Sequence, residues 1–215
     1  GLIAKYTFEK CSSLQFVDIP YGVASIEKSA FLECSSLQNV DIPSSVVAIG
    51  KGAFCKCSSL QSIDIPNSVT TIGVCSFKEC TSLKSIDIPD NVTTIGEGAF
   101  YQCTSLEVIN IPTSITYIDT WAFEECHKLK WVFVPGTDIK LAANIFGNID
   151  GDVSVYFTSS ESIASSFNSG WNNLNWNGKV VASYWNWTKR SVNYSFEPNG
   201  GMLDKTTLLS TDIIS

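Results

Sequence analysis

Apolar residues recur along most of this chain at a fixed interval of 23 residues, with no insertion across five full steps. The same step carries a cysteine, a phenylalanine, a leucine and a proline. The cysteines are Cys11, Cys34, Cys57, Cys80, Cys103 and Cys126, and the phenylalanines are Phe8, Phe31, Phe54, Phe77, Phe100 and Phe123. A fixed period of this length predicts a solenoid, because one unit cannot bury its own apolar face and must stack on copies of itself.

Within one unit, apolar and polar residues alternate over Ile63, Asp64 and Ile65, which predicts a strand with one buried face. Pro66 cannot donate to a ladder and therefore ends this strand. A second β-prone run follows at residues 69–72, and the short segment at 73–80 predicts a single helical or 3₁₀ turn. We expect equivalent strands to stack as parallel ladders about 4.8 Å apart.

The repeated pattern C-x-S-L-x-x-I-x-I-P-x-S-V-x-x-I-G-x-x-A-F resembles the BspA-type leucine-rich repeat. The resemblance covers residues 1 to about 135 and continues in a weaker form to about 157. It implies an α/β-type leucine-rich-repeat solenoid, right-handed and mostly parallel β, with short helical or 3₁₀ turns. It also implies a secreted or surface protein of bacteria or some parasitic protists, with a role in adhesion and protein binding.

The repeat pattern divides the chain into three parts. Residues 1–135 form the solenoid, with six 23-residue repeats of which the first is partial. Residues 136–178 hold a degenerate last repeat and a C-terminal cap, and residues 179–215 form a β-rich tail or a truncated following module. The stretch VNYSFEPNGG resembles the opening of small β-rich repeats in bacterial surface proteins. The chain begins inside a repeat, so we expect it to be part of a longer protein.

The composition of the chain argues against several classes of partner and of activity. The net charge of −7 and the pI of about 4.7 argue against nucleic acid or an anionic membrane surface as the main partner. No apolar run approaches the roughly 18 residues that span a bilayer, so we expect no membrane insertion. The one histidine, His127, gives no basis for a catalytic triad, and the chain has neither a glycine-rich phosphate loop nor an H-E-x-x-H motif. We therefore expect no enzyme activity, no cofactor and no metal.

Six of the eight cysteines share one position of the repeat, and we predict that they lie inside the coil as buried free thiols. Disulfides are the alternative, because stacked neighbours approach bridging distance. Cys55 and Cys75 lie off this position, and together with Cys57 they form a candidate zinc site. Their spacing does not match a C-x-x-C knuckle, which argues against zinc.

The outward positions of the strands carry the strongest functional signal. They hold a row of polar residues that ends in aromatic residues: Asp18, Asp41, Asp64, Asp87 and Asn110, followed by Phe133 and Tyr156, with Trp131 nearby. If the strands align, adjacent carboxylates lie about 5 Å apart and repel by roughly 0.8 kcal/mol in water, which is small beside the burial of one leucine. Each aspartate either caps neighbouring backbone groups or contributes to a stripe that binds a basic patch or a cation. The aromatic end favours protein binding, because exposed aromatic residues are preferred interface anchors.

These features predict a non-enzymatic protein-binding or adhesion module of an extracellular or cell-surface protein, with its ligand on the exposed strand face. The resemblance points to a host extracellular-matrix or cell-surface protein as the partner. Two alternatives stay open. One is a structural spacer that projects another domain. The other is glycan binding by a tryptophan-rich segment that otherwise caps the last coil, with Trp171, Trp176, Trp185 and Trp187.

Overall fold

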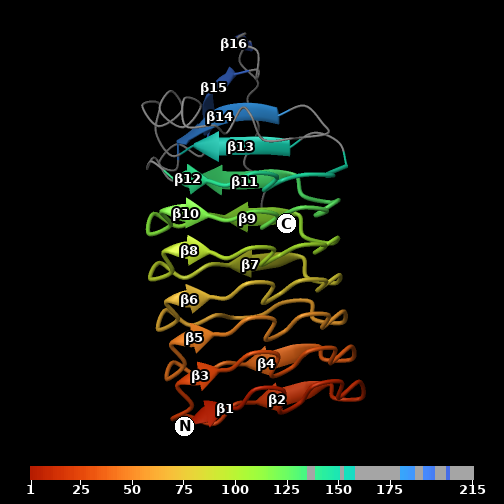
Figure 1. Ribbon diagram of the computed structural model, residues 1–215. Helices are drawn as coiled ribbons and strands as arrows, with labels where there is room; N and C mark the ends of the chain where they lie inside the picture. The colour runs from red at the N-terminus through yellow and green to blue at the C-terminus, as the bar shows by residue number, and fades with distance from the viewer. Residues whose placement is uncertain (135–138, 151–152, 158–179, 187–190, 197–201, 204–215) are drawn as a thin grey trace.

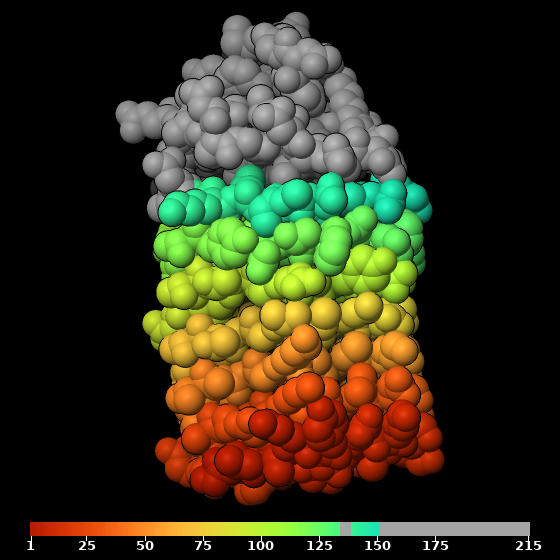
Figure 2. Space-filling view, viewed as in Figure 1, coloured from red at the N-terminus to blue at the C-terminus, as the bar shows by residue number. Residues whose placement is uncertain are grey.

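A computed structural model describes residues 1–134, 139–150, 153–157, 180–186, 191–196 and 202–203. The chain winds as a parallel β-solenoid whose turns stack along one axis (Figure 1). The turns are seen as successive bands in the space-filling view (Figure 2). The 23-residue period therefore corresponds to one turn of the coil, and the predicted solenoid is confirmed.

The first wall of the coil is one seven-stranded parallel sheet of very short strands. In spatial order its strands are β1 (Leu2–Ile3), β3 (Ser25–Ile26), β5 (Ala48–Ile49), β6 (Thr71–Ile72), β8 (Thr94–Ile95), β10 (Tyr117–Ile118) and β12 (Lys140–Leu141). Ile26 pairs with Ile49, and Ile72 pairs with Ile95, so the register advances by one repeat at each step. These isoleucines point inward and are buried.

The second wall contains two sheets. A two-stranded sheet pairs β2 (Phe16–Asp18) with β4 (Asn39–Asp41). A seven-stranded sheet contains β7 (Ser85–Asp87), β9 (Val108–Asn110), β11 (Trp131–Val134), β13 (Val153–Phe157), β14 (Val180–Asn186), β15 (Ser191–Phe196) and β16 (Met202–Leu203). The strands from β7 to β14 are parallel, whereas β15 and β16 are added antiparallel.

The strand predicted at Ile63–Ile65 does not form, and this is why the second wall is divided. Ile63 and Ile65 are buried and Asp64 is exposed, so the alternation of burial matches the prediction. Residues 61–66 nevertheless make no strand pairing with either neighbouring turn. Inward packing of side chains thus fixes the course of this segment without a continuous hydrogen-bonded ladder.

The third side of the coil, the corner wall, consists of residues 4–11, 27–34, 50–57, 73–80, 96–103, 119–126 and 142–149. The predicted helical or 3₁₀ turn is wrong here, since the described residues contain no helix. In segment 73–80, the N–H groups of Cys75, Phe77 and Glu79 donate to carbonyls of the next turn at 2.7–2.8 Å. The N–H groups between them donate to carbonyls three residues earlier. Half of the donors therefore point along the solenoid axis, which a helix does not allow.

Phenylalanine rings form the centre of the core. Successive rings, from Phe8 to Phe146, stack nearly parallel with centroids 5.1–5.5 Å apart. Beside them, the ladder thiols donate hydrogen bonds to phenylalanine carbonyls 26 residues earlier in the chain, as Cys57 does to Phe31 at 3.2 Å. Cys34, Cys80, Cys103 and Cys126 repeat this bond.

All eight cysteines are free thiols, and five of the six on the ladder are buried as predicted. Cys11 is the exception and is exposed, because it lies in the first turn and only one neighbouring turn covers it. Burial raises the pKa of Cys34 and of Cys55 from the ordinary 9.0 to about 11. It raises the pKa of the fully buried Cys80 and Cys103 further still.

Replacing one ring of the stack tests its share of the stability. Phe77 is fully buried between two rings, so Phe77→Ala should lower the free energy of unfolding by about 3–5 kcal/mol. Phe8 is half-buried and stacks on one ring, so Phe8→Ala is the matched control and should cost less. Denaturant unfolding followed by circular dichroism measures both free energies of unfolding. An equal loss in the two variants would contradict the larger contribution expected of a ring that stacks on both sides.

The side chain of Ser76 is expected to lower the stability of the fold. It occupies the position of Ala53 and Ala99, and within the described residues its fully buried hydroxyl has no hydrogen-bond partner. Ser76→Ala should therefore raise the free energy of unfolding by about 1 kcal/mol, and the reverse change Ala99→Ser should lower it similarly. Thermal unfolding of the two variants measures the effect. A less stable Ser76→Ala protein would show that the hydroxyl is satisfied.

Thiol reactivity should follow burial along the chain. The thiolate is the nucleophile, and with a pKa of about 11 only roughly 0.1% of Cys55 is ionised at pH 8. Iodoacetamide at pH 8 should therefore modify the exposed Cys11 first and the buried ladder cysteines only after denaturation. Below its pKa, the ionised fraction of a thiol rises tenfold per pH unit, so the rate of modification at Cys55 should rise about tenfold per pH unit up to pH 10. Peptide mass spectrometry gives the order, and rapid labelling of native Cys80 would contradict it.

Candidate functional site

The predicted polar row lies on the outward face of the second wall. Asp18, Asp41, Asp64, Asp87 and Asn110 are all exposed. Asp18 pairs in register with Asp41, and Asp87 pairs with Asn110, so these side chains come from adjacent strands of the parallel sheets. The inward neighbours Val40 and Ile86 are buried and hold the alternating orientation.

Asp64 belongs to the row but not to a sheet. It lies in residues 61–66, between the two-stranded sheet and the seven-stranded sheet of the second wall. Its neighbours Ile63 and Ile65 are anchored in the core, which leaves the Asp64 side chain exposed. The row therefore consists of two pairs of residues on hydrogen-bonded strands, with Asp64 between them on a segment that only side-chain packing holds in place.

The four carboxylates of the row have no partners within the described residues. None accepts a hydrogen bond from a backbone or side-chain donor, and none belongs to an ion pair. Capping of neighbouring backbone groups, the alternative considered for these aspartates, therefore does not occur there. The carboxylates are solvated and available to an external cationic group.

The aromatic end of the row differs from the prediction. Phe133 pairs in register with Asn110 and Tyr156 but, unlike Asn110, it is only 7% exposed. Trp131 is half-buried, and the Lys130 ammonium lies 5.7 Å from its ring centroid. Tyr156 pairs in register with Phe133, but its side chain lies outside the described part. Phe133 is thus a packing residue and not an exposed anchor.

An exposed aromatic residue lies instead at the other end of the row. Phe16 is 64% exposed and stands two residues before Asp18 on the same outward face of β2. It pairs in register with Asn39, so the aromatic ring and the first carboxylates lie on one small surface.

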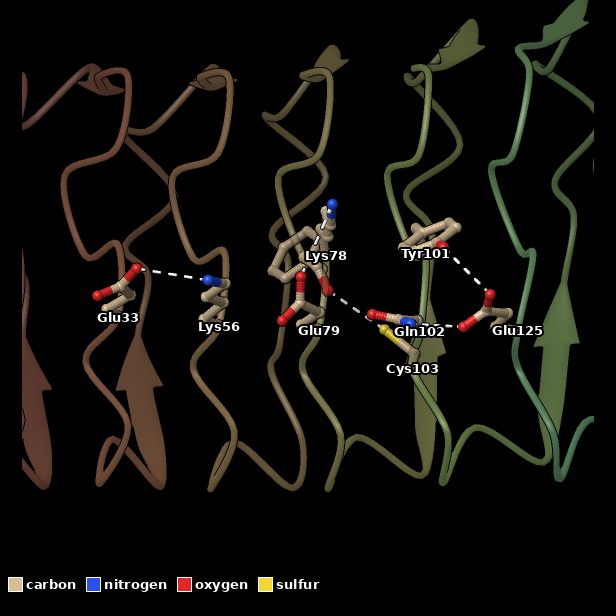
Figure 3. A network of polar contacts seen from close by, with 9 residues as sticks. Glu33, Lys56, Lys78, Glu79, Tyr101, Gln102, Cys103 and Glu125 are labelled. Atoms are coloured by element: carbon tan, nitrogen blue, oxygen red, sulfur yellow. Dashed lines mark hydrogen bonds and ion pairs between the residues drawn. The ribbon is translucent and has the colours of Figure 1, made fainter.

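The corner wall carries a second charged surface that the strand pattern does not predict. Lys10, Glu33, Lys56 and Glu79 alternate in sign at equivalent positions and line a groove of about 520 Å³ together with a row of hydroxyl residues. Glu33 and Lys56 lie 3.5 Å apart (Figure 3). Both side chains are exposed, so this pair contributes little to stability.

A separate pocket of about 410 Å³ opens farther along the corner wall. Its lining residues are Cys75, Lys78, Glu97, Gly98, Tyr101, Trp121 and Glu124. Trp121 is 42% exposed. The sequence does contain a signal for this pocket, because Trp121 occupies a repeat position filled by the small residues Ser29, Gly52, Cys75 and Gly98 in the four preceding turns, and by Tyr6 in the first turn.

The described residues offer no metal centre and no membrane-crossing helix. No group of three or more histidine, cysteine, aspartate or glutamate side chains is placed there to hold a metal ion, so Cys55, Cys57 and Cys75 do not form the candidate zinc site. No described helix is long and apolar enough to cross a bilayer. The segment with Trp171, Trp176 and Trp187, and the side chain of Trp185, lie outside the described residues.

Comparisons with known proteins agree with this architecture. The family model described as "BspA type Leucine rich repeat region (6 copies)" matches residues 2–130 and 48–175. A leucine-rich repeat protein from Bacteroides ovatus is 25% identical with a TM-score of 0.60, and the match covers 85% of this chain and 49% of that one. The leucine-rich repeat protein of T. pallidum is 28% identical with a TM-score of 0.55, and the match covers 76% and 84%.

A third structure supports the fold alone. The pneumococcal vaccine antigen PcpA is 23% identical with a TM-score of 0.61, over 78% of this chain and 41% of the antigen. This chain thus spans about half the length of the Bacteroides ovatus protein and less of the pneumococcal antigen. No curated protein matches the sequence significantly. Because the family model covers most of the chain and the coil has one turn per repeat, the protein belongs to the BspA-type leucine-rich-repeat family.

Proposed function

We propose that this solenoid is a non-enzymatic protein-binding module of an extracellular or cell-surface protein, and that it binds its partner through the outward face of the second wall. One observation carries the proposal: four exposed carboxylates in a row have no partner within the described residues. A basic patch on another protein would supply the missing counter-charges. The regular coil holds the row in place, so little ordering is needed on binding.

Charge and shape favour the same face. The net charge of −7 steers a basic partner toward the protein, and such steering acts mainly on the rate of association. Phe16 adds an exposed aromatic ring at the N-terminal end of the row, where a ring of this kind serves as an interface anchor. Membership of the BspA-type family supports a surface location, and we propose a host extracellular-matrix or cell-surface protein as the partner class.

Charge removal on the row tests this function. The triple variant Asp41→Asn, Asp64→Asn and Asp87→Asn should weaken binding to immobilised extracellular-matrix proteins by roughly tenfold or more, since each exposed charge pair contributes up to about 1 kcal/mol. The salt dependence of binding should flatten as well, because fewer charges interact. Surface plasmon resonance at low and high salt measures both effects.

The matched control removes the same charge from the corner wall, with Glu9→Gln, Glu33→Gln and Glu79→Gln. It should bind as the unmodified protein does. Equal weakening of the two triple variants would show that net charge, and not this face, governs binding. If the unmodified protein binds no matrix protein, the coil is better explained as a spacer that projects another domain.

A further inference from the structure

The pocket at Gly98 exists because one turn of the corner wall lacks a side chain. Gly98 has a φ of +56° and lies between Cys75 in the preceding turn and Trp121 in the following one. A Cβ at this position would lie 3.3 Å from the Cys75 Sγ and 3.6 Å from the Tyr101 Cβ. Glycine thus forms the floor of the pocket, and Tyr101 and Trp121 form aromatic parts of its lining.

Two tyrosine rings of this wall already form cation–π contacts with lysine side chains of the same chain. The Lys78 ammonium lies 4.9 Å from the centroid of the Tyr101 ring, and the Lys28 ammonium lies 5.5 Å from that of Tyr6 (Figure 3 shows the former). Tyr6 occupies the repeat position of Trp121. Lys28 lies 22 residues after Tyr6, whereas the residue 22 positions after Trp121 is Ala143. Within the described residues, Trp121 therefore carries no such cation, although indole is the strongest cation–π acceptor.

The charges of the pocket lining also favour a cation. The lining contains one lysine and two carboxylates, Glu97 and Glu124. The lysine, Lys78, already lies 3.7 Å from the carboxylate of Glu79, and neither Glu97 nor Glu124 forms an ion pair within the described residues. Burial and the adjacent Glu125 carboxylate raise the pKa of Glu124, and a bound cation would oppose this shift because it favours the charged carboxylate. The Asn148 amide donates to the Glu124 Oε1 at 3.4 Å, which leaves the Glu124 Oε2 for a cation.

Two hydrogen bonds keep this side of the pocket in position. The Tyr101 hydroxyl donates to the Glu125 Oε1 at 3.1 Å, and the Gln102 amide donates to the Glu125 Oε2 (Figure 3). The Tyr101 ring is thereby fixed between Lys78 and Glu125. A volume of about 410 Å³ lies at the small end of the range for ligand pockets and suits one long side chain.

We propose that this pocket binds the guanidinium group of an arginine side chain from a partner polypeptide, stacked on Trp121 and paired with Glu97 and Glu124. A planar guanidinium stacks on an aromatic face and donates to carboxylates in a fixed geometry, whereas an ammonium is a strongly hydrated point charge. The site lies on the corner wall and involves none of the residues of the aspartate row. It therefore stands or fails independently of the proposed function of the second wall.

Titration with short peptides tests the proposal on the 215-residue chain. The probe is acetyl-Gly-Arg-Gly-amide, followed by NMR at the Trp121 indole N–H, which the loss of its signal in Trp121→Phe assigns. We expect a saturable shift of this signal. The citrulline peptide, which has nearly the same shape but no charge, should bind at least tenfold more weakly, and the lysine peptide should bind several-fold more weakly.

Two variants and their controls connect the binding to the pocket. Gly98→Asn should abolish it by filling the floor, and asparagine is compatible with the backbone there because Asn144 adopts a φ of +55° at the same repeat position. Gly52→Asn makes the same change outside the pocket and should leave binding intact. Glu97→Gln with Glu124→Gln should weaken binding roughly tenfold, as expected for two carboxylate–cation pairs. Circular dichroism establishes that each variant is folded.

Several results would overturn the proposal. These are the absence of a saturable shift at tens of millimolar arginine peptide, equal binding of the citrulline or lysine peptide, and unchanged binding by folded Gly98→Asn. The same saturable shift with N-acetylglucosamine in place of the peptide would assign the pocket to carbohydrate.

Discussion

Backbone hydrogen bonds between successive turns hold this coil together, and at the corner wall they require left-handed residues at regular intervals. Twelve described non-glycine residues have φ angles between 54° and 62°. This conformation costs an L-residue about 1–2 kcal/mol, so a single turn would not keep it. It persists here because the N–H groups of nine of these residues, Lys56 for example, donate to the next turn while the stacked phenylalanines fix the spacing. The wall is therefore stable only as a set of stacked turns.

The same constraint determines which side chains reach solvent. Alternation along the strands of the second wall sends Asp41 and Asp87 outward while Val40 and Ile86 stay in the core. At the corner wall, the identity of the residues that reach solvent changes from turn to turn while the course of the backbone does not. A regular scaffold thus presents an acidic row on one wall and, on another, a pocket formed where glycine and tryptophan occupy the same position of adjacent turns.

The sequence predicts the inward-facing residues well, because a 23-residue period and a two-residue alternation decide which side chains are buried. It predicts the exposure of Asp64 but not the missing strand around it, since ladder hydrogen bonds depend on small backbone displacements that the residue pattern does not encode. It predicts a helical turn at 73–80 because the local backbone preference takes no account of the carbonyl groups of the next turn, which accept hydrogen bonds from this segment. It places Phe133 on the surface because the alternation of inward and outward positions does not show how far neighbouring side chains cover an outward residue. It does not identify Trp121, because that pocket arises between residues 23 positions apart.

The cysteine ladder has a consequence for how this chain is made. In the folded coil the ladder thiols from Cys34 to Cys126 are enclosed, hydrogen-bonded to carbonyl oxygens and held in the protonated form. In the unfolded chain all eight thiols are accessible, and in an oxidising compartment they would form disulfides in many combinations, none of which this coil contains. Folding and oxidation are therefore in kinetic competition during synthesis. Local contacts between adjacent turns favour rapid folding, and each turn that stacks removes one more thiol from the reach of an oxidant.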